Sequence, residues 1–181
     1  LIEPGALPGD FRTRMERWRL GSGSLRRNVA LAELPDFLCA PGKNAQPHHG
    51  AGIIMAPSLA YMDRAWVDAR ESGWGRAPIV EMLIPSTLDA TLAPPGSHVA
   101  SLFCQHFGPV LPAGLSWDDA REAAADAVID VVNGHAPNFK ASILAREIFT
   151  PLDTEREFGL TRGDIFHGAL GLDQLFLARP M

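Results

Sequence analysis

The sequence predicts an α+β domain with a mixed or antiparallel sheet of about five strands and helices packed on one face. Five short segments carry the apolar pattern of strands, and two longer segments repeat their apolar residues at helical spacing. The order strand, strand, helix, strand, strand, helix, strand is typical of an α+β layer. Since 46% of the residues are apolar, residues 1–181 can form a single domain with its own core.

The first part of the chain is expected to form a helix, a strand, a long loop and a second strand. The helix spans 10–20, with Asp10 as its cap, and repeats its apolar residues at helical spacing: Phe11, Met15 and Trp18. The strand over 24–31 places four side chains on one face: Leu25, Arg27, Val29 and Leu31. Residues 32–50, rich in Pro, Gly and Asn, form the loop, and 51–57 the short buried strand.

The middle of the chain is expected to form a helix and two strands. Ser58 caps the helix, which ends near Gly73 and has one apolar stripe made by Met62, Ala65, Trp66 and Ala69. Residues 77–85 are apolar apart from Glu81, which indicates a central strand. Residues 98–107 form the next strand.

A second long helix has the clearest signals of all. Ser116 and Asp119 form a variant of the capping box, and Asn133-Gly134 followed by Pro137 ends the helix. Its apolar residues recur at helical spacing: Ala120, Ala124, Ala127, Val128, Val131 and Val132. The last strand is expected over 139–150, and a short helical turn begins at Pro151.

Composition excludes some functions. The net charge of −5 argues against general nucleic-acid binding, and no apolar run approaches the roughly 18 residues of a membrane span. The N-terminus lacks the organisation of a signal peptide, and two cysteines fit a reducing compartment. The many arginines, alanines and glycines indicate a GC-rich genome. We therefore expect a cytoplasmic bacterial protein, or a mitochondrial matrix protein if it is eukaryotic.

Several motifs favour structural interpretations. Gly21-Ser22-Gly23 resembles the start of a dinucleotide-binding turn, but no apolar strand precedes it, and the chain has no P-loop and no G-x-S-x-G. The histidines lack the spacing of metal ligands, so no metal site is expected. Cys104 should be a buried inert thiol. Three carboxylates should lie in the first turn after Pro151: Asp153, Glu155 and Glu157. Six arginines should form a solvated helix face and a strand end, or could instead hold a phosphate or a partner domain: Arg12, Arg14, Arg17, Arg19, Arg26 and Arg27.

The last residues, GDIFHGALGLDQLFLARPM (163–181), mix polar and apolar side chains in a way that suits the lining of a site. His167 lies between Phe166 and Gly168, and glycine permits close approach of a backbone or a planar ligand. Two interpretations stay open: a structural histidine, or a histidine beside a redox cofactor that exchanges a proton near neutral pH. Because the first residue is Leu and the last segment is site-like, we expect truncation at both ends.

Five segments together resemble the phytoene-desaturase-like FAD-dependent oxidoreductases, and more narrowly the branch of the pyridine nucleotide-disulfide oxidoreductase domain-containing proteins. They are RRNVALAELPDF (26–37), IPSTLDATLAPPGSHVASLFCQHF (84–107), HAPNFKASIL (135–144), TPLDTEREFGLTRGDIFHG (150–168) and the terminal stretch, in the family's order. The family's Rossmann unit and its last flavin-contacting segment are absent. The resemblance therefore implies a C-terminal substrate-domain fragment whose sheet forms one wall of the cavity over the flavin.

The resemblance implies a cofactor, partners and site residues. FAD would be bound in the full-length parent, none is expected on this chain alone, and the fragment should be inactive. Its partners would be the missing FAD-binding domain, a lipophilic substrate and, through exposed apolar surface, further copies of itself. His167 would meet the flavin, Asp164 or Gln174 would orient it or hydrogen-bond, and Arg179 would lie near a phosphate or carboxylate.

Two other functions remain open. The chain could be a free-standing α+β module that binds a ligand or a protein and has no redox activity. A metal-dependent hydrolase that uses the histidines is the weakest hypothesis, since their spacing does not suit a shared metal.

Overall fold

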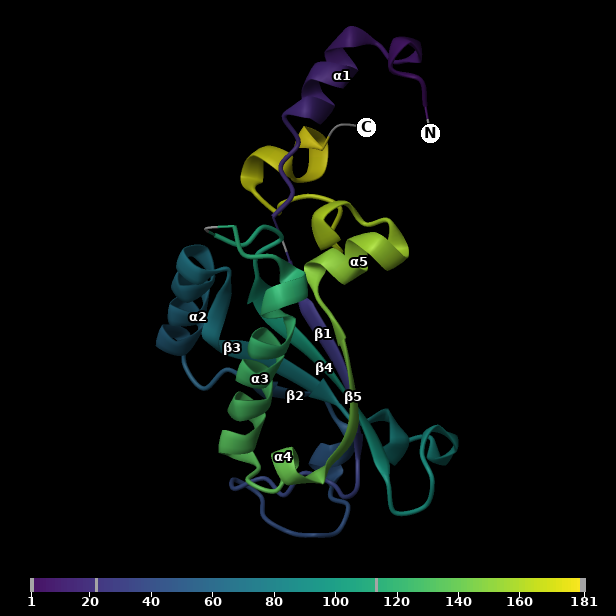
Figure 1. Cartoon of the computed structure of the whole chain (residues 1–181), viewed down its shortest axis with the longest axis vertical. Coiled ribbons are helices and arrows are strands. Elements are labelled where there is room, and N and C mark those ends of the chain that lie inside the picture. Colours follow the sequence, from purple (N-terminus) through teal and green to yellow (C-terminus); the bar gives the residue numbers. More distant parts are fainter. Residues whose placement is uncertain (1, 22, 113, 180–181) are drawn as a thin grey trace.

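The computed structural model describes residues 2–21, 23–112 and 114–179 and has a five-stranded antiparallel sheet at its centre (Figure 1). The strands are β1 (Leu25–Leu31), β2 (Ile53–Met55), β3 (Trp74–Leu83), β4 (His98–Phe107) and β5 (Ile143–Phe149). Their order across the sheet is β2-β3-β4-β1-β5, so β2 and β5 are the edges. The predicted α+β class is confirmed.

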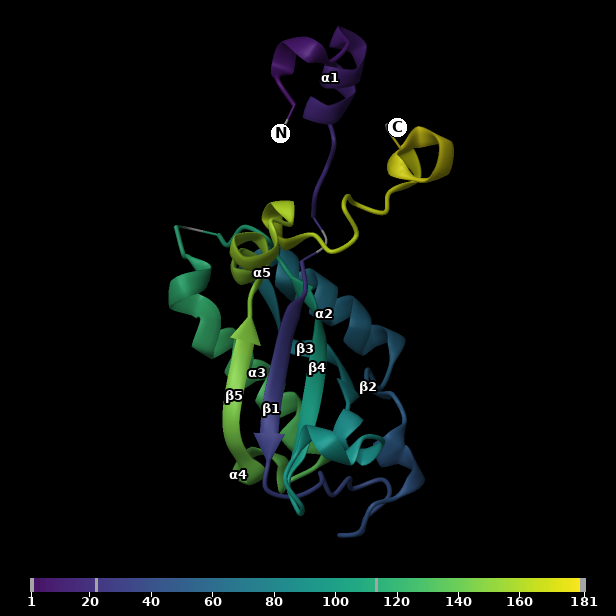
Figure 2. The ribbon, with the colours of Figure 1, turned by 90° about the vertical axis from the view of Figure 1, so that its right-hand side faces the viewer.

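The helices lie outside the sheet. They are α1 (Gly9–Glu16), α2 (Leu59–Ser72), α3 (Trp117–His135), α4 (Phe139–Ser142) and α5 (Pro151–Phe158). Figures 1 and 2 show α2 and α3 against the same face of the sheet, while the opposite face carries no α-helix. In the described part of the chain, no helix is long and apolar enough to cross a membrane.

The hydrophobic core lies between the sheet and α3. Successive side chains of a strand alternate between its faces, so every second residue of the central strands points to the helices. The antiparallel register pairs Leu25 with Cys104 and Val29 with Ala100, all four fully or almost fully buried. The facing stripe of α3 is buried as well: Ala120, Ala124, Ala125, Val128, Ile129 and Val132. Exclusion of this apolar surface from water is the main stabilising contribution to the domain.

Two of the three predicted helix caps, at Ser58 and Ser116, are confirmed. The side chain of Ser58 accepts a hydrogen bond from the Tyr61 N–H at 3.1 Å, and Gly73 ends α2 with a left-handed φ of 93°. Ser116 accepts from the Asp119 N–H at 3.2 Å. A third cap joins Thr150 and Asp153, in which each side chain accepts from the other residue's backbone N–H. Local sequence therefore fixes where three of the helices begin.

Several predicted elements differ in the structure. The strand expected over 139–150 starts with one turn of helix, α4, and becomes extended only at Ile143. The predicted strand 51–57 is reduced to three residues, and its Ile54 is exposed rather than buried. The helix expected over 10–20 ends at Glu16, has Asp10 inside its first turn rather than at its cap, and buries no side chain.

The apolar stripe of α2 does not face the core as a unit. Ala65 is buried, whereas Met62 and Trp66 are 40% and 46% exposed. Asp68 occupies the inward position next to Ala65 and is 5% exposed. The helix is therefore attached by small and polar contacts, and its larger apolar side chains point to solvent.

Two segments project beyond the sheet. Figures 1 and 2 show α1 and the C-terminal segment, residues 161–179, at the same end of the molecule, away from α4. This end holds the residues that the sequence indicates as a site.

Candidate functional site

The side chains of Asp164, His167, Gln174 and Arg179 lie in the C-terminal segment, which contains several short 3-10 turns and contacts residues 18–21 and 23. An isolated β-bridge pairs Gly23 with Asp164, and the backbone N–H of Ala169 donates to the Arg19 carbonyl at 2.8 Å. Arg19 and Gln174 touch although they are 155 positions apart in the sequence. The structure thus brings the residues that follow α1 next to the C-terminal segment.

Asp164 holds the two segments together through its carboxylate. Oδ2 accepts the N–H of Gly21 at 3.2 Å, and Oδ1 accepts the N–H of Phe166 at 2.9 Å. The residue is 2% exposed. Buried polar groups are stabilised by such hydrogen bonds, so this carboxylate anchors the chain and orients the segment that leads to His167.

Gln174 joins the two segments through hydrogen bonds to the backbone of both. Its Oε1 accepts the N–H of Arg19 at 2.8 Å, while its Nε2 donates to the carbonyls of Arg19 at 3.0 Å and Ala169 at 3.2 Å. The side chain is 5% exposed. One carboxamide thereby satisfies both main-chain polar groups of Arg19, as a neighbouring β-strand would.

His167 is exposed and has a left-handed backbone, with a φ of 58°. Its carbonyl accepts the indole N–H of Trp18 at 3.0 Å and Nη2 of Arg179 at 3.2 Å. The imidazole ring forms no hydrogen bond with any residue that the structure describes. The backbone of His167 is therefore fixed, while its ring is open to a group outside this chain.

Arg179 and Trp18 complete the arrangement. The Arg179 guanidinium lies over the Trp18 ring, 5.3 Å from its centroid, and also donates to the Phe166 carbonyl at 3.3 Å. A side chain at Gly168 would collide with the same ring, because a Cβ there would stand 2.3 Å from it. We call residues 18–21 and 164–179 the clasp.

The clasp exposes much apolar surface. Leu172, Phe176 and Leu177 are 92%, 85% and 100% exposed, and Phe166 and Leu170 are each about half exposed. An ordered segment with this much uncovered apolar surface is typical of a protein–protein or domain–domain contact.

A second candidate surface is the sheet face that has no helix. Register pairs Arg26 with Phe103, and Phe103 with Glu81, across its centre. The Arg26 guanidinium lies 5.3 Å from the Phe103 ring centroid, and Gln105 donates to Glu81 at 3.0 Å. The face is thus partly apolar, and its Arg26, Glu81 and Gln105 side chains are engaged with neighbours on the same face. A face of this kind can line a cavity for an apolar ligand.

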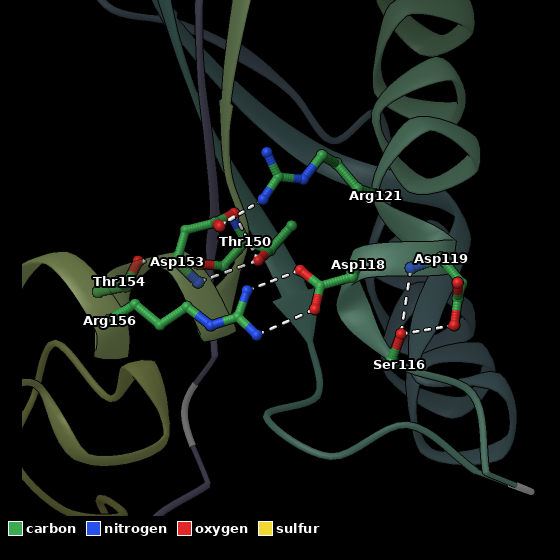
Figure 3. Close-up of polar contacts among 8 residues, drawn as sticks. All are labelled: Ser116, Asp118, Asp119, Arg121, Thr150, Asp153, Thr154 and Arg156. Atoms are coloured by element: carbon green, nitrogen blue, oxygen red, sulfur yellow. Dashed lines mark hydrogen bonds and ion pairs between the residues drawn. The ribbon is translucent and has the colours of Figure 1, made fainter.

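A charged boundary runs between α3 and the β5–α5 region. Figure 3 shows Asp118 paired with Arg156 at 2.7 and 2.9 Å, and Arg121 paired with Asp153. The hydrogen bonds from Arg156 lower the pKa of Asp118 below its usual value. Further pairs of the same kind join Arg146 to Glu122 and Asp126, and Lys140 to Asp130.

Two open depressions of about 350 Å³ each lie along this charged boundary. The charged side chains that line them include Arg121 and Arg146, which are already engaged with carboxylates. The boundary therefore attaches elements of the domain to one another and offers few free groups to a ligand.

Among the histidines outside the clasp, His49 has structural contacts, whereas the buried Nε2 of His48 has no partner among the described residues. His49 is 1% exposed, its Nδ1 accepts the Gln46 N–H at 3.0 Å, and its Nε2 contacts the Pro35 carbonyl at 2.9 Å. Burial lowers the pKa of His48, His98 and His106. Within residues 2–21, 23–112 and 114–179, no three His, Cys, Asp or Glu side chains are grouped closely enough to hold a metal ion.

Arg27 corrects the prediction of a solvated arginine cluster. It is fully buried under α3, where Nη1 donates to the Ala125 carbonyl at 2.7 Å, while Nε and Nη2 have no partner among the described residues. Desolvation by burial lowers its pKa to about 10. Cys104, buried as predicted, has its thiol pKa raised by the same effect.

Two residues of the clasp were missed by the sequence analysis. Trp18 was assigned to the apolar side of a helix, and Arg19 to a solvated cluster, yet both bind the C-terminal segment. The sequence did contain a signal for the burial of Arg27, because it alternates with Leu25, Val29 and Leu31 on one face of the strand. Nothing local in the sequence indicated that Arg19 meets Gln174.

Comparison with known proteins places this chain beside oxidoreductase-domain proteins. It is 43% identical over 180 aligned residues to pyridine nucleotide-disulfide oxidoreductase domain-containing protein 2 of Rattus norvegicus and, equally, to that of Mus musculus. Each alignment covers 97% of this chain and 31% of the relative, so the chain spans about a third of the length of the curated relatives it matches. No protein-family model matches the chain. The branch named from the resemblance is thereby supported by homology.

Proposed function

We propose that this chain is the substrate domain of a larger FAD-dependent oxidoreductase that acts on an apolar substrate and is inactive by itself. The observation that carries the proposal is the 43% identity over 97% of the chain to proteins about three times as long whose name includes an oxidoreductase domain. The helix-free face of the sheet supports it, since a sheet covered on one face can line a cavity with the other.

Gly21 and Gly23, which resemble the start of a dinucleotide-binding turn, do not fit the phosphate group of a dinucleotide. The N–H of Gly21 is donated to the Asp164 carboxylate, and a Cβ at Gly23 would stand 1.9 Å from the Phe107 carbonyl oxygen. The Gly21 N–H is therefore not free, and Gly23 is packed against the Phe107 backbone, so the two glycines do not form the open turn of a phosphate site. In this proposal FAD supplies the redox chemistry from another part of the polypeptide, and the contribution of this chain is to bind and orient the substrate.

His167 is the residue of this chain proposed to meet the cofactor. Its ring is exposed and unengaged, whereas Asp164, Gln174 and Arg179 are engaged with the backbone around it. In the longer polypeptide, His167→Ala should slow flavin reduction by substrate, measured by stopped-flow absorbance. Unchanged reduction kinetics would make His167 a purely structural residue.

The test of the proposal compares two purified proteins. The longer polypeptide that contains these residues should retain flavin through gel filtration, and the 181-residue chain should elute colourless. Flavin retained by the 181-residue chain, or absent from the longer protein under flavin-rich expression, would contradict the proposal. Concentration-dependent elution of the 181-residue chain would support the proposed exposure of a docking surface, and strictly monomeric elution at high concentration would count against it.

A free-standing binding module is the second candidate function. The continuous core between sheet and α3 favours it, because such a core does not need another domain to exclude water. A binding measurement distinguishes the two functions. If the chain is a module, the 181 residues alone should bind a ligand or protein tightly. If it is a substrate domain, binding should occur only in the longer protein.

A further inference from the structure

The inference concerns how the backbone of His167 is held. A left-handed conformation is uncommon at residues other than Gly, although His adopts it more often than most, and surrounding contacts maintain it. At His167 two donors from different parts of the chain, the Trp18 indole and the Arg179 guanidinium, converge on one carbonyl oxygen. The two donors are also stacked on each other.

The stacked pair is in turn held by the rest of the clasp. Trp18 precedes Arg19, whose N–H and carbonyl are both bound by the buried carboxamide of Gln174. Gly168 lets the indole lie directly against the chain after His167. Gln174 therefore fixes Trp18, and Trp18 fixes His167, through contacts that leave the imidazole ring itself free.

We propose that Gln174, Trp18 and Arg179 are positioning residues that hold His167 in its left-handed conformation and so set the direction of its Cα–Cβ bond before any partner binds. Only the purpose of this geometry, which is to bring the His167 ring to the flavin, rests on the proposed function. The positioning itself is a property of the 181-residue chain. In this proposal the buried side-chain amide of Gln174 preorganises His167 and does not contact a cofactor.

The first experiment is amide and indole hydrogen exchange in the isotope-labelled 181-residue chain, followed by NMR. Gln174→Leu should accelerate exchange at the Trp18 indole and at the Arg19 and Ala169 amides by at least about tenfold, because it removes the bonds to Arg19. Exchange at Leu102, in the sheet, should not change. Asp173→Asn is the matched control: it removes an exposed ion pair to Arg19 in the same turn and should change exchange less than about twofold.

The second experiment reads the conformation of His167 itself. The three-bond coupling between its amide and α protons should report a fixed left-handed φ in the parent chain and an average over conformations in Gln174→Leu. Trp18→Phe, which keeps a ring but loses the N–H donor, should move the coupling in the same direction even if Gln174→Leu unfolds the chain. His167→Gly should retain slow exchange at the Trp18 indole, and His167→Val should lose it, since a β-branched residue disfavours positive φ.

Each alternative outcome overturns the positioning role. It fails if Gln174→Leu leaves the His167 coupling and the Trp18 exchange unchanged, if Asp173→Asn has the same effect as Gln174→Leu, or if His167→Val behaves like His167→Gly. None of these measurements involves flavin. The absence of flavin from the longer protein would therefore refute the proposed function and leave the positioning role intact. Unchanged exchange and coupling in Gln174→Leu would refute the positioning role and leave the proposed function intact.

Discussion

The sheet body and the clasp are two regions of one chain that are stabilised by different forces. In the body, Leu102, Val80 and Val128 are fully buried in a continuous apolar core. In the clasp, the buried side chains include the polar Asp164 and Gln174, while Leu172, Phe176 and Leu177 point outward. Apolar burial is strong and non-directional, whereas each hydrogen bond contributes little net stability but fixes geometry.

The difference between the regions has a functional meaning. A core of this kind maintains the fold whether or not a partner is present. A clasp made of directional bonds holds a chosen backbone geometry and leaves its apolar side chains uncovered. The proposed substrate domain requires this division, because its core must maintain the fold while one shaped surface meets the rest of the longer protein.

The largest effect should come from opening the core. Leu102→Ala should lower the free energy of unfolding by about 3 kcal/mol, since it removes buried methyl groups and leaves a cavity. Urea titration with an unchanged m-value measures it. Leu177→Ala, at a fully exposed position of the clasp, is the matched control and should change stability by less than about 0.5 kcal/mol. Equal effects of the two substitutions would erase the contrast between the regions.

The parts of the body that could be predicted from sequence are the local ones. The caps at Ser58 and Ser116 are readable because a side-chain oxygen satisfies an N–H three residues away, and β4 coincides with the predicted range 98–107. The helical turn at 139–142 was missed because its apolar residues also fit a strand. Strand order depends on contacts across the chain, which periodicity does not encode.

The sequence indicated which segment holds the candidate residues, but not which residues that segment contacts. Asp164, His167, Gln174 and Arg179 were identified together from their chemistry, and the structure places them in one region. Their partners, Trp18 and Arg19, lie about 150 residues earlier and carry no local signal. Arg27 shows a different limit: its charge suggested exposure, although its register on β1 pointed to the core.

Arg27 offers a way to test whether the body tolerates a buried charge without a full set of partners. Arg27→Met should raise the free energy of unfolding by about 1 kcal/mol, since a fully buried guanidinium with two unpaired nitrogens is replaced by an apolar chain of similar length. Thermal and urea unfolding measure it. Arg26→Met, next along β1 on the exposed face, is the control and should be nearly neutral. A clear loss of stability in Arg27→Met would mean that Arg27 has favourable contacts beyond Ala125.

The polar attachment of α2 predicts a pH dependence. Hydrogen bonds from Arg76, at 2.9 and 3.1 Å, lower the pKa of Asp68 below its usual 3.8. A carboxyl whose pKa is lowered by folding stabilises the protein above its unfolded pKa, and this contribution is lost as the pH falls through the native pKa. Because the Arg76 side chain is exposed, water screens the pair and keeps its contribution to stability small.

The measurement is the difference in unfolding free energy between the parent chain and Asp68→Asn from pH 7 to pH 3. The difference should be constant at and above pH 5 and should shrink toward zero as the pH falls below 3.8. Asp63→Asn, on an exposed position of the same helix, is the control. A difference that stays constant to pH 3 would show that Asp68 contributes packing rather than charge.

The smallest effect on global stability should come from breaking the clasp alone. At Gly168, with a φ of 143°, an added Cβ would stand 2.3 Å from the Trp18 ring, so Gly168→Ala should displace the indole from the His167 carbonyl. We expect exchange of the Trp18 indole to accelerate at least about tenfold while the urea midpoint of the sheet is unchanged, because a loss of local bonds outside the core exposes no core surface.

Gly134→Ala, in the last turn of α3 with open space at its Cβ, is the matched control. It should stabilise the body by about 0.5 kcal/mol through helix propensity and leave the indole unaffected. If Gly168→Ala instead lowered the midpoint as Leu102→Ala does, the clasp would be part of the cooperative core, and the geometry of His167 would follow from global folding rather than from a few directional bonds.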